Sequence, residues 1–273
     1  MPKSLEELQN IAKRVRREIV EMIGAAKSGH PGGALSAVEI LVELYFDYMR
    51  IDPRNPKWPD RDRFILSKGH GVPVLYAVMA EAGFADTPIG RLNTLRKLGS
   101  MYQGHPDVRF TPSIEVSAGS LGEGLSLALG MGLAARLDGR AYRTYVLLGD
   151  GEIQEGQIWE AAMAGAFHKV DNVAAIVDYN RIQLDGFVKD IMEIEPLVDK
   201  WRAFGWNTLE IDGHDIPAIR KALAEAEAAK GRPTCIVAHT IKGKGVSFME
   251  NNPKFHGVAP TPVEVELALQ ELR

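Results

Sequence analysis

The feature that most restricts the fold is a regular alternation of short apolar segments and helical segments in the second half of the chain. Strand-like apolar segments are expected at 143–148, 173–178, 207–211 and 233–239. Between them, the pattern predicts helices near 156–168, 196–204 and 215–229. Strands that alternate with helices of this length form mainly parallel sheets. We therefore predict an α/β fold, a mainly parallel sheet flanked by helices on both faces.

The first half of the chain is predicted to be mostly helical. Ser4 and Glu7 form a capping-box pattern at the start of a helix that extends to about Lys27. The pattern then predicts a helix from about Leu35 to Tyr48, a strand at 63–66, a helix at 72–82, an irregular segment at 98–120 and a helix from about Leu121 to Leu137. No internal repeat or long linker divides the 273 residues, so we expect a single domain over 1–273.

Bulk properties exclude several classes of protein. The net charge is −4 and the basic residues are scattered, which argues against a nucleic-acid-binding protein. No apolar run reaches membrane-spanning length and the N-terminus has no signal-peptide pattern, so we expect a cytoplasmic protein with no membrane partner. The single Cys235 excludes an internal disulfide framework.

Two oxygen-bearing side chains follow two of the expected strands. Asp150, within Gly149-Asp150-Gly151, follows one apolar run, and Asn180 follows the next, thirty positions later. Ligands in parallel sheets bind beyond the carboxyl ends of the strands. Mg²⁺ prefers such oxygens, the Ile182 carbonyl offers a third, and Gly151 permits close approach of a phosphate. We predict a cation and diphosphate site, the alternative being a helix cap at Asp150 and an Asx turn at Asn180.

Four histidines have glycine or proline neighbours and are therefore expected on turns, namely His30, His70, His105 and His256. Imidazole can donate to phosphate and hydroxyl oxygens and can transfer protons near neutral pH. Each one alone has an ordinary packing role as its alternative. A zinc site competes as an interpretation, but no HxxxH pattern or cysteine pair supports it. We interpret His168, His214 and His239 as structural, although His239 ends an expected strand.

The segment 116–124 is a glycine-rich entry into a helix. It lacks the G-x-G-x-x-G pattern and has no good strand ahead of it, so a dinucleotide site is disfavoured. Its small residues are better suited to a flat ring or a partner chain close to the backbone.

Taken together, these motifs resemble the N-terminal half of transketolase. The resemblance rests on SGHPGG at Ser28, SKGHG at Ser67, GHPD at Gly104, AGSLGEGLSLALG at Ala118, GDGEIQEGQIWEA at Gly149, DYNRIQLDG at Asp178, DGHD at Asp212, HTIKGKG at His239 and FHGVAP at Phe255. It covers nearly the whole chain in the family's order. It implies the thiamine-diphosphate-binding fold, specifically the diphosphate-binding domain.

The resemblance also implies roles for individual residues. Asp150, Asn180 and the Ile182 carbonyl match ligands of Mg²⁺, or of Ca²⁺ or Mn²⁺ in its place. The groups that match holders of thiamine diphosphate are Gly151, Asn180, His70 and His256, with Gly119, Ser120 and Leu121 against its rings. His30, His105 and His256 match histidines that bind sugar hydroxyls and assist proton transfer. Glu155 matches an acidic position in a network between subunits.

The family's pyrimidine-binding and C-terminal domains have no counterpart in the sequence. That part carries a glutamate that activates the cofactor, so we expect it on a separate chain. The resemblance thus implies the N-terminal subunit of a split transketolase, a heterotetramer with self-contact of this chain. It would transfer a two-carbon ketol unit from a ketose phosphate to an aldose phosphate, in the pentose phosphate pathway or a specialised route. The alternatives are a pyruvate-using carboligase similar to deoxyxylulose-phosphate synthase and a non-catalytic binding subunit.

Overall fold

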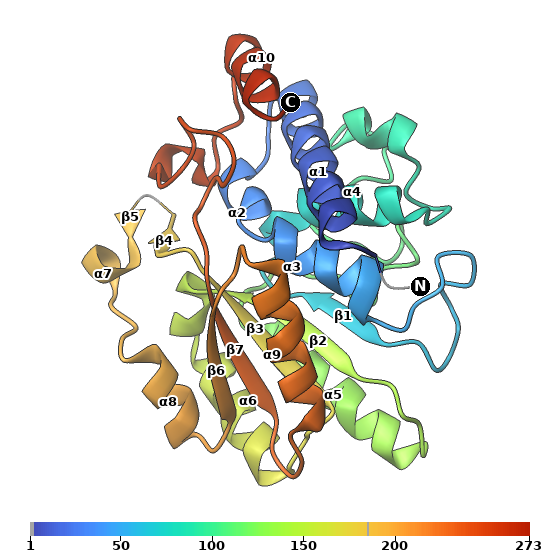
Figure 1. The fold of residues 1–273 in the computed structure, drawn as a ribbon, viewed down its shortest axis with the longest axis vertical. Coiled ribbons are helices and arrows are strands. Elements are labelled where there is room, and N and C mark those ends of the chain that lie inside the picture. The colour runs from blue at the N-terminus through green and yellow to red at the C-terminus, as the bar shows by residue number, and fades with distance from the viewer. Residues whose placement is uncertain (1–2, 185) are drawn as a thin grey trace.

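A five-stranded parallel sheet forms the centre of the molecule (Figure 1). The computed structural model describes residues 3–184 and 186–273. The strand order is β1-β2-β3-β7-β6, and every neighbouring pair is parallel. The strands are β1 (Arg63–Leu66), β2 (Thr144–Gly149), β3 (Val173–Tyr179), β6 (Asn207–Asp212) and β7 (Thr234–His239), and a separate antiparallel pair is formed by β4 (Ile182–Gln183) and β5 (Gly186–Phe187). The predicted α/β fold is confirmed.

The helices cover both faces of this sheet. The α-helices are α1 (Leu5–Ala26), α2 (Pro31–Leu35), α3 (Val38–Glu43), α4 (Val72–Ala82), α5 (Glu123–Leu137), α6 (Gly156–Phe167), α7 (Val188–Ile191), α8 (Leu197–Ala203), α9 (Ile216–Ala228) and α10 (Pro262–Glu271). Shorter pieces are the π-helix η1 (Leu44–Tyr48) and the 3₁₀ helices η2 (Gly69–Gly71), η3 (Ile89–Thr94), η4 (Gly151–Gln154) and η5 (Pro253–His256).

Alternate residues of the central strands pack into two separate cores. On β2, Tyr145 and Leu147 belong to the core under α1, α3, α4 and α9. Val146 and Leu148 belong to the core under α5, α6 and α8. Successive side chains of a strand point to opposite faces, so a strand buried on both sides must be apolar at nearly every position. This explains why the sequence shows continuous apolar runs here instead of alternation.

The prediction of one continuous helix from Leu35 to Tyr48 is wrong, because this segment is interrupted. The chain forms α2, α3 and η1 in succession, and Ala37 between the first two has non-helical backbone angles of φ −97° and ψ 5°. This break lets the Ser36 hydroxyl donate to Asp178 at 2.6 Å, a contact that no helical periodicity reveals. The helix predicted from Leu121 begins instead at Glu123, because Gly122 has a left-handed φ of +92°. The pair β4 and β5 and helix α7 were not predicted.

Turns after four strands meet at one edge of the sheet. The register pairs Gly149 of β2 with Asp178 of β3, and Tyr179 of β3 with His239 of β7. The segments that follow β1, β2, β3 and β7 are therefore neighbours, and each contains a motif with expected functional residues. No helix within residues 3–184 and 186–273 has the length and apolar character needed to cross a bilayer.

Candidate active site

A cavity of about 320 Å³ lies at this edge of the sheet. It is lined by His30, Gly33, Lys68, His70, Gly119, Leu121, Gly149, Asp150, Gly151, Glu152, Gln154, Glu155, Asn180, Ile182, Gln183, Leu184, Lys242 and His256. These residues come from the turns after β1, β2, β3 and β7, the start of α2, the entry to α5 and the segment near η5. Most of the residues singled out from the sequence are therefore brought to one cavity.

The three predicted metal ligands lie together in this cavity. Asp150 is 2% exposed and its carboxylate accepts from the backbone N–H of Gly151 at 2.8 Å and from that of Arg181. The Asn180 Oδ1 accepts from the Ile182 N–H at 3.1 Å, and its Nδ2 donates to Asp178 at 3.1 Å. Because hydrogen bonds fix both the oxygen and the nitrogen of this side-chain amide, the oxygen is held toward Ile182.

The donor set fits a hard divalent cation. Burial, followed by the nearby Asp178 charge, raises the pKa of Asp150 to about 7. Asp150 forms no ion pair with a lysine or arginine in the part of the chain that the structure describes. A buried carboxylate outside any such ion pair, an amide oxygen and a carbonyl oxygen together match the ligand preference of Mg²⁺. Over the same residues, no cluster of three His, Cys, Asp or Glu side chains supports the zinc alternative.

Two buried lysines also line the cavity, and the sequence interpretation missed both. Lys242 is 2% exposed, and its ammonium donates to the Ile182 carbonyl and to His256 Nδ1, each at 2.7 Å. Burial lowers the pKa of Lys242 to about 8. Lys68 is 1% exposed, donates to the Gly33 carbonyl at 2.8 Å and pairs with Asp178. Both stand directly before a turn glycine that follows a strand, in the motifs SKGHG and HTIKGKG, and this pattern was the signal available in the sequence.

Asp178 organises the base of the cavity although it was not singled out. It is fully buried and accepts from Ser36 at 2.6 Å, from Asn180 and from Thr240. Burial raises its pKa, but the Lys68 ammonium and the hydroxyl donors outweigh burial and hold the pKa below its usual value. Asp178 is therefore a carboxylate that fixes the side chains around it.

The four turn histidines form one cluster. The ring centroid of His30 lies 5.2 Å from His70, 5.6 Å from His256 and 6.5 Å from His105. Burial lowers the pKa of each ring, to about 4 for His30 and about 3 for His256, with added effects of Arg96 on His30 and Lys242 on His256. All four imidazoles are thus neutral at neutral pH.

Cationic groups also set the tautomers of two of these rings. Arg96 Nη2 lies 3.4 Å from His30 Nδ1, and Lys242 Nζ lies 2.7 Å from His256 Nδ1. Guanidinium and ammonium groups only donate, so each Nδ1 must accept and each ring carries its proton on Nε2. Both histidines consequently present an N–H donor on the side away from the cation.

Some predicted residues lie at or beyond the rim. Ser120 is exposed and does not line the cavity, whereas Gly119 and Leu121 do. His105 is also outside the lining, but a Cβ built on Gly119 would lie 3.3 Å from its ring. Glu155 lines the cavity with an exposed side chain. His239 contacts Glu210 at 2.7 Å and Arg181 at 3.2 Å, outside the cavity lining.

Residues 8–272 match the family model described as "Transketolase, thiamine diphosphate binding domain". The chain belongs to the transketolase family. It is 47% identical over 266 residues to the 6-deoxy-6-sulfo-D-fructose transketolase subunit of Clostridium sp. (strain MSTE9), covering 97% of this chain and 96% of that one. It is 43% identical over 268 residues to an apulose-4-phosphate transketolase subunit of Phocaeicola vulgatus, covering 98% of this chain and 94% of the relative.

Solved transketolases share the fold but are much longer. The transketolase of Campylobacter jejuni superposes with a TM-score of 0.93 at 32% sequence identity, covering 99% of this chain and 43% of that one. The chain therefore spans less than half of that transketolase and nearly all of the two transketolase subunits. The resemblance found in the sequence is confirmed at the level of family and fold.

Proposed function

We propose that this chain is the thiamine-diphosphate-binding subunit of a two-chain transketolase. With a second chain that carries the pyrimidine-binding domain, it would transfer a two-carbon ketol unit from a ketose phosphate to an aldose phosphate. The observation that carries this proposal is the position of Asp150, Asn180 and the Ile182 carbonyl in a cavity that three neutral histidines also line, with His105 next to His30 outside the lining. The near-complete overlap with two relatives named as transketolase subunits supports the two-chain assignment.

The cavity contains suitable groups for each part of the cofactor. Asp150, Asn180 and the Ile182 carbonyl would hold Mg²⁺; the carbonyl has a second lone pair, so its bond to Lys242 does not exclude an ion. Gly151, Asn180, His70, His256 and Lys242 would hold the diphosphate. The segment Gly119, Ser120 and Leu121 would lie against the rings. When bound, thiamine diphosphate supplies the electron sink that carbon–carbon bond cleavage requires.

The histidines would act on the sugar. His30 and His256 present Nε2–H donors, and a neutral donor in a partly buried cavity stabilises negative charge that develops on a substrate oxygen. His105 beside Gly119 would bind a hydroxyl of the donor fragment. The rim residue Glu155 would join the corresponding network of a second subunit. These groups bind and orient the sugar, while the chemistry of bond cleavage belongs to the cofactor.

Substitution of Asp150 tests the metal site. Asp150→Ala should weaken Mg²⁺-dependent binding of thiamine diphosphate to the two-chain complex by more than about 100-fold, because even groups that only orient metal ligands contribute 10- to 100-fold. Isothermal titration with the cofactor, in the presence and absence of Mg²⁺, measures this change. Asp199→Ala, at a carboxylate whose side chain is 69% exposed, is the matched control and should bind normally. Normal cofactor binding by Asp150→Ala would refute the assignment.

The preferred sugar defines the second question. The two relatives are named for 6-deoxy-6-sulfo-D-fructose and apulose 4-phosphate, so donors of both kinds belong in the assay beside xylulose 5-phosphate and pyruvate. Ketol transfer from a ketose is expected and pyruvate should not serve. Turnover of pyruvate would favour the carboligase alternative, and no turnover of any donor by a cofactor-loaded complex would favour a binding subunit.

A further inference from the structure

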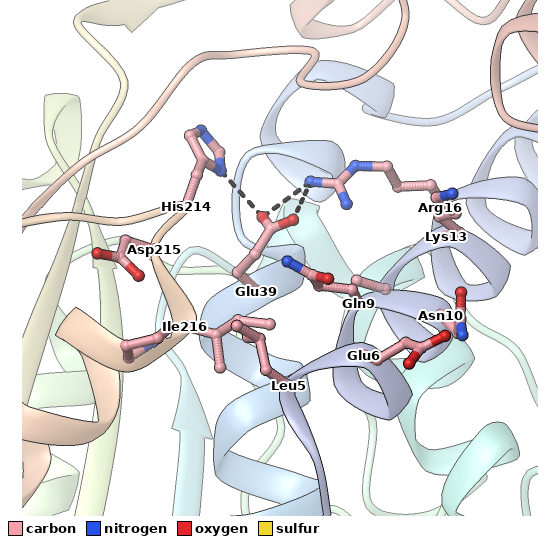
Figure 2. A pocket seen from close by; sticks show the side chains of 12 residues that line it. Leu5, Glu6, Gln9, Asn10, Lys13, Arg16, Glu39, His214, Asp215 and Ile216 are labelled. Carbon is pink, nitrogen blue, oxygen red and sulfur yellow. Dashed lines mark hydrogen bonds and ion pairs between the residues drawn. The ribbon is translucent and has the colours of Figure 1, made fainter.

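A second group of polar side chains, a buried arginine and glutamate with a part-buried histidine, lies behind the turn that carries Lys242. Arg16 of α1, Glu39 of α3 and His214, which follows β6, form the Arg16–Glu39–His214 cluster (Figure 2). Arg16 Nη2 lies 2.7 and 2.8 Å from the two Glu39 oxygens, and His214 Nδ1 lies 2.9 Å from Glu39 Oε2. The cluster borders a cavity of about 540 Å³ that shares no lining residue with the cofactor cavity.

Both outer members of the cluster bind the backbone of the lysine loop, residues 241–245. The Ile241 N–H donates to His214 Nε2 at 2.9 Å. Arg16 Nε donates to the Lys244 carbonyl at 3.0 Å. Because His214 Nε2 accepts this bond, its proton is on Nδ1 and points to Glu39. A continuous set of hydrogen bonds therefore fixes the backbone on each side of Lys242.

The conformation of the lysine loop allows little adjustment. Gly243 has a left-handed φ of +81°, and its N–H donates to the Gly32 carbonyl at 3.0 Å. A Cβ on Gly243 would lie 2.3 Å from the Met249 carbonyl oxygen, so no other residue fits there. On the opposite side, the Lys242 ammonium reaches the Ile182 carbonyl and His256. The position of this ammonium is thus set by the backbone that the cluster holds.

We propose that the Arg16–Glu39–His214 cluster is a positioning device for the cofactor, acting through the lysine loop on Lys242. This inference rests on the proposed function, in which Lys242 meets the diphosphate. His214 and Arg16 touch neither cofactor nor substrate, so their effect must pass through Lys242. If the cluster only stabilised the fold, substituting one of its residues would change the cofactor affinity by the same factor whether or not Lys242 is present.

Two replacements of His214 separate its two hydrogen bonds. In His214→Asn, the amide nitrogen takes the place of Nδ1 and still donates to Glu39, but the Ile241 N–H loses its acceptor. In His214→Gln, the longer side chain brings an oxygen to the place of Nε2 and restores that acceptor. His214→Asn should raise the Kd for thiamine diphosphate about 10-fold, as expected for a group that orients a ligand, and His214→Gln should recover most of it. The exposed His168→Asn is the matched control.

A double-mutant cycle with Lys242→Ala decides the proposal. Binding is measured by titration of thiamine diphosphate into the two-chain complex with Mg²⁺, and kcat is measured at saturating cofactor. Lys242→Ala should raise the Kd strongly, and adding His214→Asn should raise it no further, because the positioned group is gone. The kcat of His214→Asn at saturation should stay within about twofold of wild type, since only cofactor affinity is affected.

The outcomes distinguish this inference from the proposed function. If the effects of Lys242→Ala and His214→Asn multiply, the cluster does not act through the lysine and the inference fails while the cofactor site stands. If Lys242→Ala binds the cofactor normally, the inference fails, and with it the diphosphate role assigned to Lys242. Should His214→Asn not assemble, Arg16→Lys replaces it in the same cycle, because it keeps the charge next to Glu39 but loses the bond from Nε to the loop.

Discussion

At the scale of single residues, the cavity is controlled by fixed cations placed behind its histidines. Arg96 has a left-handed φ of +58° and donates to Ser28 Oγ at 2.9 Å, which holds its guanidinium beside His30. Its charge adds to burial in lowering the pKa of both His30 and His105. His30, with a pKa of about 4, is thereby kept neutral well below neutral pH, and the pKa of His105 is lowered in the same direction. They are suited to donate hydrogen bonds and not to carry a charge.

Replacing Arg96 should change this protonation behaviour. In Arg96→Gln the positive charge is removed while burial remains, so the pKa of His30 should rise from about 4 part of the way toward 6.5. The same direction is expected for His105. At pH 5 the imidazolium fraction of His30 would then exceed the roughly one tenth that a pKa of about 4 gives the wild type.

Side-chain NMR of ¹⁵N-labelled histidine across pH 3.5–8 measures both pKa values. The ring of His168, exposed at the end of α6, serves as the reference for general effects of the substitution. An unchanged or lower His30 pKa in Arg96→Gln would show that the guanidinium does not control this ring.

The sequence predicted the cavity residues that directly follow a strand, and it missed those that are held in place by an ion pair with a distant residue. Asp150 and Asn180 were placed correctly because parallel strands bring their carboxyl ends to one edge. Lys68 was missed because its meaning depends on Asp178, which lies 110 positions away in the chain. A buried ion pair leaves no local pattern, since a lysine in a glycine-rich turn is normally solvated.

At the scale of elements, α1 carries ionisable side chains into its contact with α4. Glu18 of α1 is part-buried, and burial followed by the charge of Glu81 on α4 raises its pKa to about 8. Glu81 itself accepts from Arg14 of α1 at 2.7 Å. Glu81 is therefore paired with an arginine, whereas Glu18 is protonated in the folded protein at neutral pH.

This arrangement predicts a pH-dependent stability. A carboxyl group with a folded pKa of about 8 and an ordinary value near 4.5 when unfolded binds its proton more tightly in the folded state. Its stabilising contribution to the free energy of unfolding is therefore fully present below pH 4.5 and is lost as the pH rises from 4.5 to 8. Above pH 8 the buried charge lowers the free energy of unfolding by a constant amount. Glu18→Gln removes that penalty without changing shape. We expect the Tm to rise by about 2 °C at pH 8.5 and to change little at pH 4.5, a small value because the group is partly solvated.

Thermal unfolding of both proteins at a series of pH values gives the comparison. Glu225→Gln, at a side chain that is 49% exposed on α9, should show no such trend. A Tm gain that is equal at pH 4.5 and pH 8.5 would attribute the effect to helix propensity.

The broken helical segment at 31–48 shows where element prediction fails. Apolar periodicity reports only that one side of a segment is buried, and 31–48 is buried almost throughout its first part. The interruption at Ala37 serves the bond from Ser36 to Asp178, which joins α2 to the sheet. Such a tertiary hydrogen bond is invisible to local patterns.

At the scale of the whole molecule, two adjacent helices carry apolar side chains that are exposed to water when this chain is alone. On α6, Met163 is 56% and Phe167 is 80% exposed, and on the neighbouring α5, Leu127 is 41% exposed. Grouped apolar exposure of this kind is typical of surfaces that bind another protein. We expect copies of this chain to meet through α5 and α6, and we propose that the active complex contains two subunits of each kind.

Mass measurement by light scattering tests this assembly. Each copy of this chain contributes 30.0 kDa, and the wild-type complex should have the mass of two copies plus two partner chains. Introducing charge by Met163→Glu with Phe167→Glu should reduce the mass to one of each, because two buried carboxylates without cations oppose the contact. Val263→Glu, at a side chain that is 67% exposed on α10, should leave the mass unchanged. If the wild-type complex already has the mass of one copy of each chain, the proposed contact through α5 and α6 is wrong. The cofactor site would then need only the partner chain, and Glu155 would have no second copy with which to form a network.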